Sequence, residues 1–317
     1  MPIKSSYLPD GVEDITAVDA KNLESTKRAL IDFYESEGFQ LTYPSLVEFA
    51  DAIGGGDQNQ TLKDSAFSFN DDLSTKELAI RPDISQQIAR IDQEEATKEE
   101  RRYCYAGEVL KKRKDSFSRS RITIKSGVEI FGGKDNRFEI LKLLSKSMEI
   151  TKIKDLTLSF GKTEVFDSFL DTCALSDKEG NELNNIISTK SESDLTDWVK
   201  DKEIEEKVKD KLIKLMNCKG DLSVLSDLEA LEVEKDLLKD IESIWNFVDK
   251  ETLFEPHIDM TDFPGFNYHS GLVFSVHSKN FGFSIANGGQ YNINSGAINR
   301  SAIGFDKDLF AITKINS

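Results

Sequence analysis

Cysteine is scarce in this chain: the 317 residues contain three, at Cys104, Cys173 and Cys218, and no CxxC pair occurs. An odd and scattered set of thiols argues against a disulfide framework and favours a reducing compartment. Residues 1–5 lack the apolar segment of a secretion signal, and no apolar run approaches the roughly 20 residues that span a bilayer. These absences predict a cytoplasmic protein without a membrane segment.

Positive charge is also in deficit, because 41 Lys and Arg residues stand against 57 Asp and Glu residues, for a formal net charge of -16. Nucleic-acid binding draws most of its affinity from cationic contacts to phosphate, so this balance argues against DNA or tRNA as a partner. With 38% hydrophobic and 31% charged residues, the chain is expected to form a packed core with a charged surface.

The sequence also lacks the common nucleotide-binding and catalytic motifs: there is no Walker loop, no nucleophile elbow and no GxGxxG. Its three histidines, His257, His269 and His277, lack the spacing and the neighbouring cysteine or acidic ligands of a zinc site. Neither a metal ion nor another cofactor is therefore expected.

Apolar periodicity predicts an α+β fold with a mostly antiparallel sheet flanked by helices. Helical spacing covers residues 18–37, 46–53, 83–91, 135–150, 164–175 and 302–312. Strand patterns cover residues 39–46, 66–69, 78–81, 103–111, 122–131, 156–160, 255–259, 271–276 and 281–286. The stretch from about residue 176 to residue 250 is rich in Lys, Glu, Asp and Leu at helical spacing, which predicts a helical insertion in the main fold.

Asp83 and Ser85 lie where a predicted strand gives way to a predicted helix, directly after Arg81 and Pro82. One interpretation is that they bind an ammonium group, because a carboxylate forms a charge-assisted hydrogen bond to the α-ammonium of an amino acid. The other interpretation is that Asp83 only caps its helix, which is a common role for Asp at such a position.

Glu129 lies between Val128 and Ile130 in a predicted strand, so its carboxylate faces the opposite side from its apolar neighbours. It either accepts a hydrogen bond from a ligand such as an imidazole or belongs to a solvated strand face. Gly288 and Gly289 allow either a tight turn beside a ligand or an ordinary hairpin.

The only dense basic cluster lies between two predicted strands and consists of Lys111, Lys112, Arg113, Lys114, Arg119 and Arg121. It is either a functional segment, namely a phosphate-binding loop or a docking patch for an anionic partner, or a solvated flexible loop. His269, in the run Tyr-His-Ser-Gly ahead of an apolar strand, is a further candidate for ligand binding because imidazole both donates and accepts hydrogen bonds.

Several segments, taken in order, resemble the catalytic domain of histidyl-tRNA synthetase, a class II fold. They resemble still more closely its paralogues, the regulatory subunits of ATP phosphoribosyltransferase. The matching segments are residues 8–14, 81–91, 265–274, 288–292 and 304–309. The run Tyr-His-Ser-Gly-Leu-Val-Phe at residues 268–274 is the most specific of them. The resemblance implies one synthetase-like core domain over residues 1–317, with the helical insertion and without an anticodon-binding domain.

The chain departs from the synthetase at three positions where that enzyme places arginines for ATP and adenylate formation. Lys111, Pro264 and Ala311 stand there instead. Losing a preorganised cation at a developing phosphate charge costs about 3–4 kcal/mol, and Lys does not reproduce the planar fork of Arg. The resemblance therefore implies a chain without aminoacyl-tRNA synthetase activity.

What the resemblance retains is an amino-acid pocket. The histidine-binding set that it implies consists of Asp83, Ser85, Lys125, Glu129, Tyr268, His269 and Tyr291. In that set, Asp83 and Ser85 would hold the α-ammonium. Glu129, Tyr268 and His269 would face the imidazole ring. Lys125 takes the place of a glutamine that approaches the substrate carboxylate, so it either pairs with that carboxylate or fills the pocket.

By this resemblance the chain is expected to be the non-catalytic regulatory subunit of ATP phosphoribosyltransferase, the first step of histidine biosynthesis. Such a subunit forms a homodimer within a hetero-oligomer, activates the short-form catalytic subunit and relays allosteric feedback inhibition by histidine. Two other hypotheses stay open on the sequence. One is a truncated synthetase-like enzyme that activates an amino acid without charging tRNA, and the other is a stand-alone histidine-binding protein.

Overall fold

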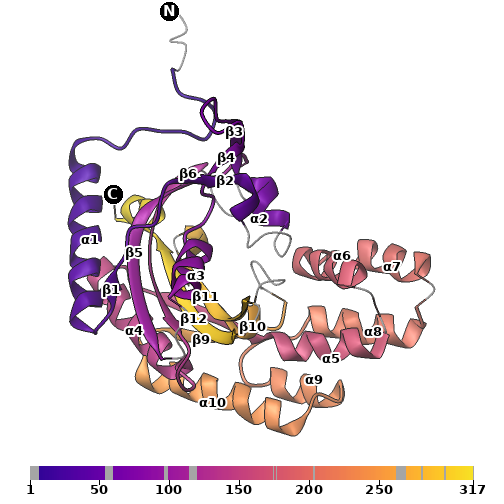
Figure 1. The fold of residues 1–317 in the computed structure, drawn as a ribbon. Coiled ribbons are helices and arrows are strands. Elements are labelled where there is room, and N and C mark those ends of the chain that lie inside the picture. The colour runs from indigo at the N-terminus through magenta and orange to yellow at the C-terminus, as the bar shows by residue number, and fades with distance from the viewer. Residues whose placement is uncertain are drawn as a thin grey trace, which may run out of the picture.

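A nine-stranded sheet organises the fold (Figure 1). The computed structural model describes residues 7–53, 60–95, 99–113, 120–173, 175, 177–202, 204–261, 269–279, 281–295 and 298–316. In spatial order, the strands are β1 (Gln40–Leu41), β5 (Arg101–Leu110), β6 (Ile122–Phe131), β12 (Ile298–Asp308), β11 (Phe281–Ser295), β10 (His269–Ser278), β7 (Leu156–Lys162), β9 (Glu255–Asp259) and β8 (Lys219–Gly220). Only the β1–β5 and β7–β9 pairs are parallel, so the predicted, mostly antiparallel sheet is confirmed.

Helices cover both faces of this sheet. One face packs against α1 (Ala17–Ser36), α4 (Arg137–Thr151), α5 (Thr163–Cys173), α10 (Lys235–Glu251) and α11 (Leu309–Ile315). The other face meets α3 (Ser85–Glu94) through a second, smaller apolar cluster that includes Ile88 and Phe131. Within the described ranges, no helix has the length and apolar character that crossing a membrane requires.

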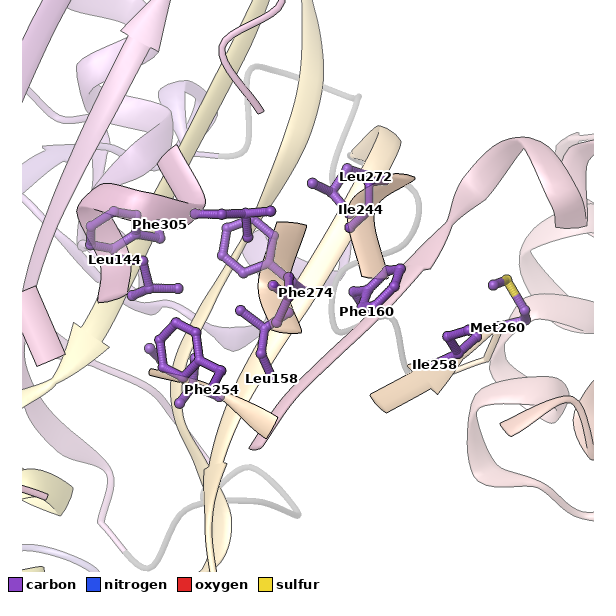
Figure 2. Packing of buried hydrophobic residues seen from close by; sticks show 14 of the residues in the cluster. Leu144, Leu158, Phe160, Ile244, Phe254, Ile258, Met260, Leu272, Phe274 and Phe305 are labelled. Carbon is purple, nitrogen blue, oxygen red and sulfur yellow. The ribbon is translucent and has the colours of Figure 1, made fainter. Parts of the chain in front are cut away.

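The main core lies between the sheet and its first group of helices. Figure 2 shows Leu144 of α4 and Ile244 of α10 in one buried cluster with Phe160, Phe274 and Phe305 from three strands. Full burial of each such side chain contributes about 1.5–3 kcal/mol to folding, and their alternation along the strands is what directs them to this face.

The predicted helical stretch contains α6 (Asp177–Thr189), α7 (Glu192–Asp201), α8 (Glu206–Met216) and α9 (Val224–Ala230) ahead of α10. The helices α6 and α7 lie apart from the large sheet, whereas α10 lies along it (Figure 1). Leu183, Leu212 and Leu228 from this stretch nevertheless belong to the same apolar cluster as the sheet core. An ion pair of 2.6 Å between Lys190 and Asp259 ties the end of α6 to β9.

A separate small sheet follows β1 in the chain. It has the order β2 (Val47–Phe49), β4 (Glu77–Ile80) and β3 (Phe67–Asn70), and it is flanked by a short 3-10 helix (Ala50–Ala52) and α2 (Gln60–Ser65). The prediction of a helix over 46–53 was wrong. Val47 and Phe49 alternate with Glu48 and pair with β4, so a strand period was mistaken for a helical one. The strand predicted over 39–46 forms only at β1.

The predicted closing helix over 302–312 was also wrong in its first half. Strand β12 continues to Asp308, and α11 begins at Leu309. Because β12 pairs with a strand on each side and its residues 302–305 are buried on both faces, this apolar stretch does not alternate and cannot be told from a helix by periodicity. The switch occurs at Asp308, whose carboxylate accepts hydrogen bonds from the amides of Phe310 at 2.9 Å and Ala311 at 3.0 Å.

The two consecutive glycines Gly288 and Gly289 lie inside β11 and not in a turn, which corrects both interpretations of them. A Cβ atom at Gly288 would lie 2.4 Å from the carbonyl oxygen of Gly304 and 2.5 Å from the ring of Phe274. Glycine is therefore required by close packing within the sheet.

We expect Gly288→Ala to lower the free energy of unfolding by about 1–3 kcal/mol, because the added methyl group meets backbone and a buried ring. Gly282→Ala on the same strand is the matched control, since a Cβ there meets nothing within 4 Å. Urea denaturation of both variants measures the difference. Equal stability of the two variants would contradict the packing argument.

Candidate functional site

Four hydroxyl or carboxyl side chains converge on the face of the large sheet that α3 covers. The phenol of Tyr291 on β11 donates to Glu129 Oε2 at 2.9 Å, and the phenol of Tyr105 on β5 donates to Glu129 Oε1 at 3.5 Å. The hydroxyl of Ser85, at the start of α3, lies 3.1 Å from the phenol oxygen of Tyr105. The structure thus brings Ser85, Glu129 and Tyr291 of the predicted set together, around a tyrosine that the sequence analysis had not selected.

The carboxyl group of Glu129 fits here because the facing residue on β12 is Gly304. The two residues are direct partners in the β6–β12 register. A Cβ atom at Gly304 would lie 2.0 Å from Glu129 Oε2, so any larger residue would displace the carboxyl group. The glycine of the Gly-Phe-Asp segment therefore makes room for this site.

Glu129 is only 1% exposed, which excludes the solvated strand face as its environment. Burial raises the pKa of its carboxyl group to about 8, against the opposing effect of hydrogen bonds from Ser85 and Tyr291. The charges of Asp83 and Asp306 push the pKa in the same direction as burial. At neutral pH the protonated form of Glu129 is therefore favoured, and a cation bound beside it would favour the ionised form.

Asp83 does not cap α3, so the capping interpretation was wrong. The residue at the cap position is Ile84, and no side-chain hydrogen bond closes this helix end. Burial raises the pKa of Asp83, and the charge of Asp306 adds to that effect, while Lys111 and Lys125 oppose it. Its carboxyl group thus belongs to the same electrostatic cluster as Glu129.

The loop before α3 is held by Arg81, a side chain that the sequence analysis quoted but gave no role. This guanidinium is 5% exposed and donates to the carbonyl oxygens of Glu108 at 2.7 Å and Pro44 at 2.9 Å. These bonds fix the chain two residues ahead of Asp83. A buried Arg that donates its hydrogen bonds to backbone carbonyls leaves no pattern in the sequence, because both partners are distant in the chain.

Lys125 is paired within the protein. Its ammonium group lies 2.7 Å from Asp306 Oδ1, and each side chain is 16% exposed. Burial lowers the pKa of Lys125, but the charges of Asp306 and Asp308 outweigh burial and raise it overall. Lys125 therefore remains a cation, and Asp306 is a member of the site that the sequence analysis missed.

The structure describes the remaining predicted positions only in part. Tyr268 and Pro264 lie outside the described residues, and of His269 the structure describes the backbone, which begins β10 in register with Tyr291. Of the basic cluster, residues 114–119 lie outside the described ranges. Arg121 stacks over the ring of Phe67 at 4.7 Å. Ala311, at a position where the resemblance implies an ATP-binding arginine in the synthetase, is buried in α11.

A cavity of about 270 Å³ adjoins Tyr291 where β10 and β11 meet the start of α5. Its lining includes Thr163, Glu164, Gln290 and Asn292, and every other lining residue is also polar or glycine. Such a lining offers hydrogen-bonding groups to a ligand. Among the residues that the structure describes, no group of three His, Cys, Asp or Glu side chains is placed to hold a metal ion.

Comparison with known proteins assigns the fold and the family. The family model described as histidyl-tRNA synthetase matches residues 11–312. A protein of Saccharophagus degradans named ATP phosphoribosyltransferase regulatory subunit is 30% identical over 97% of this chain and 81% of its own length. A Bacillus halodurans structure titled ATP phosphoribosyltransferase regulatory subunit/histidyl-tRNA synthetase superposes with a TM-score of 0.80 at 16% identity, covering 99% of this chain and 84% of that one. A chain of the ATP phosphoribosyl transferase (HisG:HisZ) complex from Thermotoga maritima superposes with a TM-score of 0.65 at 16% identity, covering 93% and 98%.

The raised pKa of Glu129 has a measurable consequence for stability. The pKa of Glu129 is 4.5 in the unfolded chain and about 8 in the folded protein. Between these two pH values the unfolded chain releases a proton that the folded protein keeps. The contribution of this group to the free energy of unfolding is therefore constant below pH 4.5. As the pH rises from there to about 8, the contribution falls by about 1.4 kcal/mol per pH unit for one proton.

Glu129→Gln should remove this dependence, so the stability of the variant relative to the unmodified protein should rise between pH 5 and pH 8 by about 1 kcal/mol per unit. Urea denaturation without ligand at pH 5, 6.5 and 8 measures the trend. Parallel stability curves for the two proteins over this range would show that Glu129 titrates normally.

Proposed function

Because the chain belongs to the family of ATP phosphoribosyltransferase regulatory subunits, which share the histidyl-tRNA synthetase fold, we propose that it binds and activates a short-form catalytic subunit of that enzyme. The likeness extends over nearly the whole chain in sequence as well as in fold. The Thermotoga maritima chain of the same fold comes from a complex of the phosphoribosyl transferase, which supports a partner of this kind. In this role the chain itself is not an enzyme.

We further propose that histidine is the allosteric ligand and that it occupies the site around Glu129. The observation that carries this proposal is the buried Glu129 carboxyl group, which has two phenol donors and a cluster of acidic neighbours. Such a group binds best to a ligand that brings an N–H donor or a positive charge, as an imidazole ring does. Asp83, two residues ahead of α3, and Ser85, the first residue of α3, would hold the α-ammonium.

The proposed regulation is a coupling free energy between this pocket and the active site of the partner. Histidine inhibits only if it binds the inhibited assembly more tightly than the active assembly. A homodimer within a larger cytoplasmic complex is part of the same proposal. Ala311 and Lys111, where the synthetase family would place arginines, support a chain that no longer forms an adenylate.

The test is a phosphoribosyltransferase assay of the short-form catalytic subunit, with and without this chain, titrated with histidine. We expect the chain to raise the rate and histidine to lower it again. Glu129→Gln should weaken the effect of histidine by about tenfold or more, because a hydrogen bond to a charged group contributes about 1.5–3 kcal/mol. Glu229→Gln, on the exposed side of α9, is the control and should respond as the unmodified protein does.

Two results would reject this function. The first is a catalytic rate that neither the chain nor histidine changes. The second is histidine-dependent exchange of pyrophosphate into ATP by this chain alone, which would restore the hypothesis of an amino-acid-activating enzyme.

A further inference from the structure

The ion pair between Lys125 and Asp306 lies on the same sheet face as Glu129. Lys125 and Glu129 are four residues apart on β6, so their side chains point the same way, and Gly127 between them contributes no side chain. Asp306 is the register partner of Gly127 on β12. Its carboxylate therefore lies diagonally across from Lys125, at 2.7 Å, beside the region where a ligand held by Glu129 would extend.

Carboxyl groups gather around Lys125, because Asp306 and Asp83 both act on it. The cations that act on Asp83 are Arg81, Lys111 and Lys125, and the charges of Asp83 and Asp306 act on Glu129. A further carboxylate, Asp308, is held by the hydroxyl of Thr123 and by the first amides of α11. Tyr105 adds a neutral phenol.

A ligand carboxylate in this region would approach Lys125, whose positive charge is already paired with Asp306. To bind Lys125 it must compete with Asp306, which is held at hydrogen-bond distance and is largely shielded from water. The acidic neighbours repel the incoming carboxylate at the same time. The positively charged groups of the ligand are attracted instead, because they face the carboxyl groups of Glu129 and Asp83.

We propose that the Lys125–Asp306 pair is a specificity determinant that withholds Lys125 from the ligand carboxylate. The site then takes imidazole-bearing primary amines as a class, and the carboxylate of the ligand contributes little to affinity. This inference rests on the histidine site proposed above and refines which chemical groups of the ligand it recognises.

The proposal is tested by isothermal titration calorimetry of the full chain with histidine and with histidinol, in which a hydroxymethyl group replaces the carboxylate. For the unmodified protein the two dissociation constants should agree to within about threefold. Asp306→Asn keeps the shape of the side chain but releases Lys125. It should favour histidine over histidinol by roughly ten- to a hundredfold, the value of one hydrogen bond to a charged group.

A double variant, Lys125→Gln with Asp306→Asn, serves as the matched control. It removes both charges together, so its preference should return to that of the unmodified protein. If the single variant fails to fold, the ratio for the unmodified protein still decides the question. A preference of the unmodified protein for histidine of tenfold or more would overturn the proposal, and so would a folded Asp306→Asn protein with an unchanged ratio.

The failure of this inference is distinguishable from the failure of the proposed function. If the chain activates the catalytic subunit and binds histidine but selects strongly for its carboxylate, only the specificity proposal is rejected. If neither ligand binds, the histidine site itself is rejected and the specificity proposal with it. Activation of the partner is measured separately and depends on neither result.

Discussion

Burial of the Glu129 carboxyl group is the constraint on which the rest of the site depends. Removing a carboxylate from water is costly unless it is paired or hydrogen-bonded, and among the described side chains it is hydroxyl groups, not cations, that meet it. The sheet accommodates this group only because Gly304 lies opposite. A ligand that supplied an N–H donor or a positive charge would offset the unfavourable burial, so the energetic cost of burying Glu129 would become selectivity for such a ligand.

The sequence predicted the long strands β5 and β6 correctly because Tyr, Val and Ile recur in them and charged segments flank both. Both faces of β6 are buried over residues 127–131, and Glu129 stood out as a charged residue between two apolar neighbours. Periodicity failed for β12, because its residues 302–305 form a short apolar run that suits a helix as well as a buried strand. It failed again at Val47 and Phe49, where three residues are too few to separate a strand period from a helical one.

The composition of the site was less predictable than its location. Asp306 and Tyr105 join Glu129 through strand register, and register is a relation between segments more than 20 residues apart. Asp83 was misread from its immediate neighbours. Its place just before a helix suggested an N-cap, but its side chain does not cap α3. A cap is recognised from four neighbouring residues, whereas a binding carboxylate is recognised only when its distant neighbours are known.

Strand β12 gives the pocket a physical connection to the helices on the far side of the sheet. Asp306 faces the pocket, while the next residue, Lys307, faces the core and donates to the phenol of Tyr34 on α1 at 2.7 Å. Burial lowers the pKa of Lys307 well below its ordinary value, so this contact suits an amine in a dry interior. Asp308 then caps α11, which packs on α1. A change at the pocket face of β12 therefore acts on a strand that is fastened to both helices. Allosteric coupling requires such an element with two alternative arrangements, and the protonated and ionised forms of Glu129, the register partner of Gly304 on this strand, would supply them.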